Sequence, residues 1–244
     1  MELFERTIID IRNDIQKKKY VELSALQDTG NWPGGAGRNV VLTEDMAVEL
    51  GNPQKDSSSS LLWTQHADMI SDGKITLIGP DIPSSIGLSL PFGKVVLVAV
   101  NGFNEDNTYD RYKEMEAVRY ALDLKGYMIR AVSQYQREWS RISREAVQKG
   151  FSFKVLGSEL RKEYLKKDYI RAVEFIFMTS SMEDVRELKD ITKNVGRTIN
   201  ALDKMLNEIE ADCDECEYND VCDEVGEIKK VKKNRDEKRM KANG

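Results

Sequence analysis

The chain has 244 residues, of which 40% are hydrophobic and 32% are charged, and its formal net charge is −5. This apolar content is enough for the core of one large domain or two small ones, and the charged content indicates a solvated surface. The longest apolar run, Val95–Val100, has the length of a strand, so we expect no membrane span. The first residues lack the basic-then-apolar order of a signal peptide, and we therefore expect a cytoplasmic protein with reduced thiols.

The N-terminal half predicts one helix followed by several short strands. Apolar residues at helical spacing indicate a helix over Phe4–Val21. Two segments rich in Gly or Ser, Asp28–Asn39 and Gln54–Ser60, are expected to be loops. Apolar runs bounded by turn residues predict strands, which are Val40–Leu42, Ala47–Leu50, Ser60–Thr64, Lys74–Ile78 and Lys94–Val100.

The second half predicts alternating helices and strands. The expected helices are Asn104–Lys125, Arg141–Lys149 with Ser140 as its cap, Ser158–Lys167 and Glu183–Ile209. The expected strands are Tyr127–Val132 and Arg171–Met178. We therefore predict an α/β or α+β domain over residues 1–209, with a mixed sheet, flanking helices and a long C-terminal helix leading to a cysteine loop.

All three cysteines follow that long helix, as Cys213-x-x-Cys216 and then Cys222. A CxxC sequence brings two thiolates to one point, and a third thiolate six residues on supplies another corner of a tetrahedral site. Such a triad in a reduced compartment is typical of an iron–sulfur cluster, and we expect one of the 4Fe-4S type. The alternatives are zinc, a CxxC redox pair and cysteines without metal. The fourth ligand can be a small molecule, a partner chain or one of three side chains, namely Asp212, Asp220 and His66.

Charge is segregated around these cysteines. The segment Asn207–Ile228 contains ten acidic residues and no Lys or Arg, whereas Lys229–Gly244 contains eight basic and two acidic residues. Carboxylates favour a dication such as zinc and oppose further negative charge, so a cluster here is expected to have a low reduction potential. We therefore distinguish an acidic metal-binding segment, residues 210–226, from a basic tail, residues 227–244. The tail lacks interleaved aromatic residues, which favours a solvated tail over nucleic-acid binding.

A basic, aromatic stretch precedes the helix predicted at Arg141–Lys149. Arg137, Arg141 and Arg144 surround Trp139, and guanidinium groups near an indole can pair with phosphates and stack on a planar ring. The alternative is a helix start whose arginines pair with nearby acids. The glycine loop Trp32–Arg38 can also hold a phosphate on backbone amides, but it matches no phosphate-binding fingerprint, and a plain loop is favoured.

Several segments, taken in order, resemble the middle domain of acetyl-CoA synthase, the beta subunit of the carbon monoxide dehydrogenase/acetyl-CoA synthase complex. They are Ala47–Gly51, Asp72–Ile82, Leu90–Gly93, Trp139–Gly150 and Arg171–Thr179, followed by a helix, CxxC and a third Cys. The resemblance extends over residues 45–222 and implies an iron–sulfur cluster. Because Trp139 and Arg141 fall on the motif proposed to contact coenzyme A in that family, the resemblance also implies coenzyme A as a ligand.

The chain departs from that family at the metal site. Its third cysteine comes sooner after CxxC, and the sequence contains neither a fourth cysteine nor the Cys-Gly-Cys that holds nickel in the family. We therefore expect an accessory or electron-transfer subunit in the one-carbon or acyl-CoA metabolism of an anaerobe, with a partner such as a carbon monoxide dehydrogenase-type complex. The alternatives are a catalytic subunit completed by another chain and a zinc-stabilised interaction module.

Overall fold

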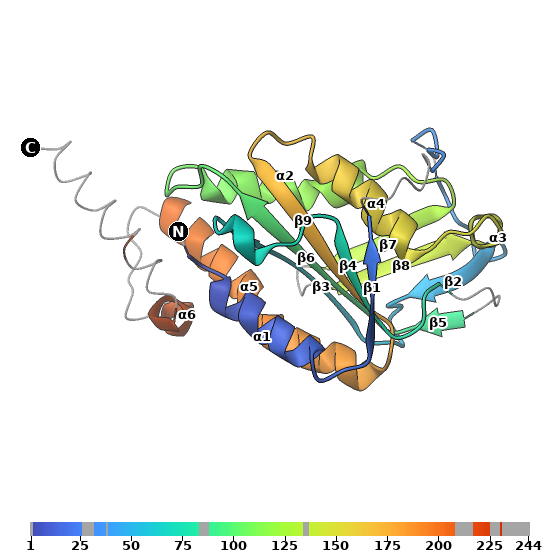
Figure 1. The fold of residues 1–244 in the computed structure, drawn as a ribbon, viewed down its shortest axis with the longest axis horizontal. Coiled ribbons are helices and arrows are strands. Elements are labelled where there is room, and N and C mark those ends of the chain that lie inside the picture. The colour runs from blue at the N-terminus through green and yellow to red at the C-terminus, as the bar shows by residue number, and fades with distance from the viewer. Residues whose placement is uncertain are drawn as a thin grey trace, which may run out of the picture.

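A computed structural model of the chain describes residues 2–25, 32–37, 39–82, 88–133, 137–207, 217–224 and 230. The described residues form two mixed β-sheets with helices around them, which confirms the predicted fold class (Figure 1). Within these residues, no helix is both long enough and apolar enough to span a membrane.

The larger sheet has five strands in the order β1-β4-β9-β6-β3. Both outer pairs join strands of the first half, and β9, which comes late in the chain, lies between them. β4 and β9 are parallel, whereas β9 and β6 are antiparallel. The strands are β1 (Tyr20–Ser24), β3 (Ser57–Thr64), β4 (Lys74–Ile78), β6 (Phe92–Val100) and β9 (Ile170–Met178).

The smaller sheet has four strands in the order β5-β2-β8-β7. Its central strand, β8, is antiparallel to both of its neighbours, β2 and β7. The strands are β2 (Met46–Leu50), β5 (Leu88–Leu90), β7 (Tyr127–Ser133) and β8 (Arg137–Ser143). This sheet carries the tryptophan and two of the arginines that the sequence singled out.

Helices cover both faces of the larger sheet. α1 (Glu5–Ile15) and α5 (Met182–Asn207) lie together on one face, and α2 (Thr108–Ala121) and α4 (Phe153–Tyr164) lie on the other (Figure 1). The shorter helices are the 3-10 helix η1 (Ala67–Met69), α3 (Arg144–Gln148) and α6 (Asn219–Glu224). The core between these layers contains packed aromatic rings, since the buried Trp63 contacts Phe4 with ring centroids 4.5 Å apart.

Strands β4, β6 and β9 and helices α2 and α5 confirm the corresponding predictions to within a few residues. The helix predicted at Ser158–Lys167 is also present, as α4, but it spans Phe153–Tyr164. The prediction of a loop at Gln54–Ser60 was wrong for its second half. Ser57–Ser60 begins β3, pairs with Phe92–Val95 and is buried along its length. Serine has little strand propensity of its own, and the burial that holds it in the sheet comes from β6, α5 and β8.

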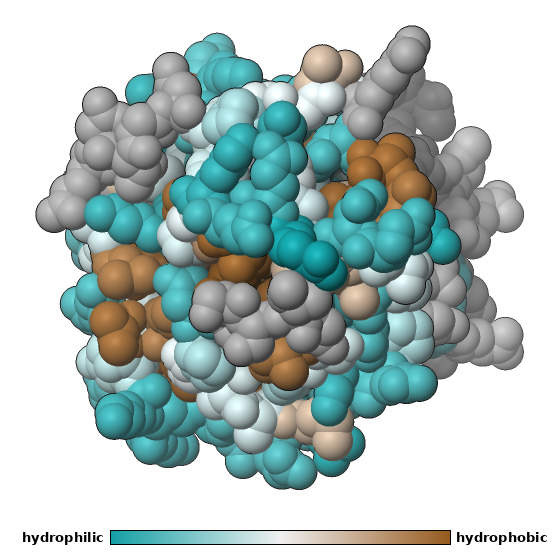
Figure 2. All heavy atoms as spheres, turned by 90° about the vertical axis from the view of Figure 1, so that its right-hand side faces the viewer, coloured by the Kyte–Doolittle hydropathy of each residue, from teal (hydrophilic) through white to brown (hydrophobic). Residues whose placement is uncertain are grey.

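Two further predictions were wrong in their boundaries or type, and one strand was missed. The first helix ends at Ile15, because the lysine run is followed by β1, which pairs with β4. The expected strand Val40–Leu42 is irregular, and Val40 and Leu42 are exposed. Strand β5 was not predicted at all. Figure 2 views the molecule from the side where β2, β5 and α3 lie and shows separate hydrophobic patches on a mainly hydrophilic face.

The prediction of a helix over Arg141–Lys149 with Ser140 as its cap was also wrong. The strand β8 continues to Ser143, and the helix that follows, α3, contains only Arg144–Gln148. Ser143 is its cap, with its hydroxyl accepting a hydrogen bond from the Ala146 amide at 3.1 Å. The segment Arg137–Ser143 forms a strand because β2 and β7 pair with it on both sides. Its alternating residues fit the two faces of that strand.

Candidate functional site

The pleat of β8 decides which of the predicted site residues share a face. Along Arg137–Ser143, partly exposed and buried side chains alternate. Arg137, Trp139 and Arg141 are therefore partly exposed, whereas Glu138 and Ser140 point into the protein.

Trp139 lies next to two guanidinium groups. The Arg141 Cζ is 5.3 Å from the centroid of the indole and the Arg130 Cζ is 5.7 Å from it. Both distances fall within the range of cation–π attraction. The indole Nε1 is buried and has no hydrogen-bond partner among the described residues. Arg141 Nε donates to Glu49 Oε1 at 2.9 Å, so part of its charge is already balanced.

The three arginines predicted to surround Trp139 are not brought together. Arg137 Nη2 reaches the Lys55 carbonyl at 3.5 Å, and Arg137 lines a cleft that neither Trp139 nor Arg141 lines. Arg144 begins α3, and its amide donates to the Asp45 carbonyl at 2.9 Å. Arg130 takes their place. Sequence reasoning missed it because only the pairing of β7 with β8 brings it beside the indole.

A buried ion pair fixes β8 to the larger sheet. Lys94 on β6 pairs with Glu138, and the side chains are 6% and 0% exposed. The Ser57 hydroxyl donates to the Glu138 carbonyl at 2.7 Å and accepts from the Glu138 amide at 2.9 Å. Burial lowers the pKa of Lys94, and the charge of Glu138 opposes that effect. This pair connects the strand that carries Trp139 and Arg141 with the larger sheet, and nothing in the sequence spacing indicated it.

The glycine loop already holds an anion from its own chain. The amides of Gly35 and Gly37 donate to the two carboxylate oxygens of Asp123, at 2.9 and 3.0 Å. A Cβ on Gly35 would lie 2.5 Å from Asn39 Cβ and 2.7 Å from Asp123 Oδ1. Glycine is needed here to let the backbone approach Asp123, which supports the prediction of a structural loop.

Of the three cysteines, the structure describes only Cys222. Cys213 and Cys216 lie outside the described residues, and Cys222 lies on α6, partly buried against the core. Arg197 on α5 fixes that helix, because its two terminal nitrogens each reach an oxygen of Asp220 at 2.7 Å. Arg197 Nη2 also donates to the Glu217 carbonyl at 3.0 Å. Within the described part of the chain, no three His, Cys, Asp or Glu residues form a metal-binding group.

The donor chemistry of the triad fits an iron–sulfur cluster or zinc, since both bind thiolates. The two described candidates for a fourth ligand already have partners. Asp220 accepts from Arg197, and that hydrogen bond lowers the pKa of its carboxyl. His66 Nε2 lies 2.9 Å from Glu2 Oε1, and this contact raises the pKa of the imidazole. Asp212 lies outside the described residues.

The sequence profile of the family described as "CO dehydrogenase/acetyl-CoA synthase complex beta subunit" matches residues 36–185. The matched part contains β8, Trp139 and Arg141, whereas the three cysteines lie beyond it.

Two curated relatives carry related names. The chain is 30% identical over 167 residues to the acetyl-CoA decarbonylase/synthase complex subunit beta of Methanopyrus kandleri, covering 67% of this chain and 34% of that protein. It is 29% identical over 155 residues to the carbon monoxide dehydrogenase/acetyl-CoA synthase subunit alpha of Moorella thermoacetica, covering 61% of this chain and 20% of that protein. The chain thus spans about a third of the first relative and a fifth of the second. Because the profile covers more than half of the chain, this protein belongs to the CO dehydrogenase/acetyl-CoA synthase complex beta subunit family.

Proposed function

We propose that this protein is an iron–sulfur subunit that works beside a carbon monoxide dehydrogenase-type complex in one-carbon or acyl-CoA metabolism. The observation that carries the proposal is the position of Cys222. Arg197 on α5 binds Asp220 on the helix that carries Cys222, which supports a defined place for one ligand of the triad. The relatives' names denote subunits of a complex, which supports a protein partner. The cytoplasm is its proposed location, because thiolate ligands persist in a reduced compartment.

Cys213, Cys216 and Cys222 would hold the cluster, and a 4Fe-4S cluster would supply one-electron transfer. Arg197 would position Cys222 by keeping α6 against α5. The buried Val221 contributes to the same contact, since its side chain is 1% exposed.

Iron and sulfide analysis of anaerobically purified protein tests this function. We expect both elements, with broad visible absorbance that dithionite bleaches if the cluster is redox-active. Zinc without iron would instead make the protein a zinc-stabilised interaction module, because the same thiolates bind zinc tetrahedrally.

Two variants test how the site is held. Cys222→Ser should abolish the metal while the circular dichroism of the domain stays unchanged. Arg197→Ala should lower the metal content, because α6 loses its double hydrogen bond to α5. Arg186→Ala is the matched control, since Arg186 lies on the same helix and its partner, Asp56, is remote from the cysteines in sequence. Full metal content in both cysteine and Arg197 variants would contradict the proposed site.

The accessory role has its own test. The isolated chain should not form acetyl-CoA from carbon monoxide, a methyl donor and coenzyme A, even with added nickel, because it lacks a Cys-Gly-Cys chelate. Turnover by the chain alone would contradict an accessory role. Turnover that appears only with a second chain would favour the alternative of a catalytic subunit completed by a partner.

A second proposal concerns coenzyme A at Trp139. It is supported by the two guanidinium groups beside the indole, which can pair with phosphate while the ring packs against a base. We expect weak binding in a calorimetric titration, and Trp139→Ala and Arg141→Ala should each weaken it several-fold. Arg144→Ala is the control, because Arg144 lies on α3 and the arginines over the indole among the described residues are Arg130 and Arg141. Equal binding by wild type and both site variants would leave Trp139 as a packing residue only.

A further inference from the structure

A cleft with an excess of basic side chains lies between the edge strand β3, helices α2 and α5, and the turn before α6. Its volume is about 980 Å³, which is enough for a nucleotide-sized ligand. Seven Lys and Arg residues line it, against two Glu residues. The cleft is separate from the indole of Trp139, because neither Trp139 nor Arg141 lines it.

Part of this positive charge is balanced inside the protein. Lys94 pairs with Glu138, and Arg197 pairs with Asp220. Arg119 and Lys113 share Glu116, at 2.6 and 3.5 Å. The ion pairs of the described residues do not include Arg137, Lys189 or Lys193. These three side chains therefore supply the excess positive charge of the cleft.

The lysines form a row along α5. Lys189, Lys193 and Arg197 follow one another at intervals of four residues and all line the cleft. Like charges at this spacing destabilise a helix, so the row does not serve the stability of α5. Gly196 on the same helix also lines the cleft. Ser60, which is 4% exposed, also lines the cleft, and its hydroxyl has no hydrogen-bond partner among the described residues.

We propose that this cleft binds a ligand carrying a diphosphate group. Lys189 and Lys193 meet the phosphates from α5, and Arg137 meets them from β8, where its planar guanidinium can donate two parallel hydrogen bonds. The negative charge of two phosphate groups matches the three positive charges of Arg137, Lys189 and Lys193 better than that of one phosphate group. Tyr120, which is 70% exposed and has Arg119 over its ring at 5.7 Å, offers a stacking surface at the rim. A nucleoside diphosphate combines both groups.

Calorimetric titration of the anaerobically purified full chain with ADP and with inorganic pyrophosphate tests the proposal. Both probes should bind, and raised salt should weaken binding because the contacts are between charges. The double variant Lys189→Ala/Lys193→Ala should weaken binding about tenfold or more. Tighter binding of ADP than of pyrophosphate would show that the ring is also recognised, and equal binding would restrict recognition to the phosphates.

The matched control is Lys17→Ala/Lys19→Ala, which removes the same charge from another surface pocket and should bind both probes like the wild type. Trp139→Ala should also bind both probes normally, which separates this cleft from the proposed coenzyme A contact. Absence of heat at millimolar ADP and pyrophosphate would overturn the proposal. So would equal loss of binding in both lysine double variants, because the effect would then come from net charge alone.

Discussion

The Glu138 side chain has no exposed surface, although the residues before and after it on β8 are partly exposed. Besides Lys94, its oxygens lie near the Ser59 hydroxyl at 3.3 Å and the Tyr127 hydroxyl at 3.5 Å. A charge this deep is stable only while its partners remain, since desolvation of an unpaired ion costs several kcal/mol. The positions of the partly exposed side chains on β8, such as Trp139 and Arg141, therefore depend on the buried Glu138.

Replacing one residue of the Lys94–Glu138 pair should lower the free energy of unfolding more than replacing both. Lys94→Met leaves a buried carboxylate without its cation, and we expect a loss of about 3–5 kcal/mol in unfolding free energy. The double variant Lys94→Met/Glu138→Leu should recover much of that loss, because no buried charge remains. Urea denaturation of both variants provides the measurement. A double variant no more stable than Lys94→Met would mean that packing, rather than the unpaired charge, causes the loss.

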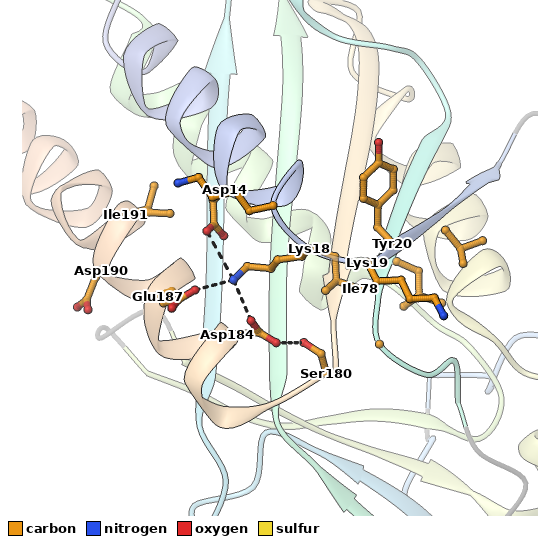
Figure 3. Close-up of a pocket in the computed structure, with 14 residues that line it drawn as sticks. Asp14, Lys18, Lys19, Tyr20, Ile78, Ser180, Asp184, Glu187, Asp190 and Ile191 are labelled. Carbon is orange, nitrogen blue, oxygen red and sulfur yellow. Dashed lines mark hydrogen bonds and ion pairs between the residues drawn. The ribbon is translucent and has the colours of Figure 1, made fainter.

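A second ion cluster joins α1 to α5 around Lys18, beside a pocket of about 1030 Å³ (Figure 3). Lys18 Nζ lies 2.8 Å from Asp184 Oδ1 and 2.5 Å from Glu187 Oε2. Burial alone would lower the pKa of Lys18 and raise that of Asp184. The hydrogen bonds between the charged groups outweigh burial, so the pKa of Lys18 is raised and that of Asp184 is lowered.

The lowered pKa of Asp184 gives a pH-dependent contribution to stability. Its carboxylate stabilises the folded state above the unfolded pKa, about 3.9, and this contribution is lost as the pH falls through the folded pKa. The difference in melting temperature between wild type and Asp184→Asn should therefore be constant from about pH 7 to 5 and shrink below about pH 4. Asp190→Asn, in the same pocket but outside this ion cluster, is the control. A difference that persists unchanged at low pH would contradict the role of the charge.

Among the elements, the buried strands β4, β6 and β9 could be predicted from sequence because their apolar runs are continuous. The first half of β3 could not, since its serines have the composition of a loop, whereas its second half, Ser60–Thr64, was predicted as a strand. β8 was taken for the approach to a helix because its arginines and serines alternate without an apolar face. In both strands the neighbours decide the structure, and these neighbours are distant in sequence.

The glycine loop gives a prediction for adjacent residues. Gly35→Ala should destabilise the protein by about 1–3 kcal/mol, because the new methyl group would meet Asn39 and displace the Asp123 carboxylate. Gly34→Ala should have a smaller effect, since its nearest neighbour would be Asp123 Oδ2 at 3.3 Å. Thermal denaturation compares the two variants, and equal losses would indicate that backbone entropy rather than the close approach governs the loop.

For the whole molecule, the division into a domain of residues 1–209, a cysteine segment and a tail remains a prediction. The described part of the cysteine segment contacts the domain, because Val221 is buried and Arg197 binds the Asp220 side chain and the Glu217 carbonyl. The sequence could indicate the cysteines, but it could not indicate that the third one returns to α5. That return depends on an ion pair between residues in separate segments.

Truncation after residue 209 tests the division. We expect the fragment to fold cooperatively, with a melting temperature lower by roughly 5–10 °C, because it loses the burial of Val221. Calorimetry of the fragment and of the full chain provides the comparison. An unfolded fragment would show that the segment around α6 is part of the domain, while an unchanged melting temperature would show that the contact with α5 adds no stability.

The position of β9 has a consequence for biosynthesis. β9 separates β4 from β6 in the larger sheet, although it is made after most of the chain. Until Ile170–Met178 leaves the ribosome, the growing polypeptide can form the pairs β1–β4 and β3–β6 but cannot join them. Two apolar strand edges then face water and other nascent chains, a state prone to aggregation. Expression should therefore depend on chaperones that bind the emerging chain before β9 is complete.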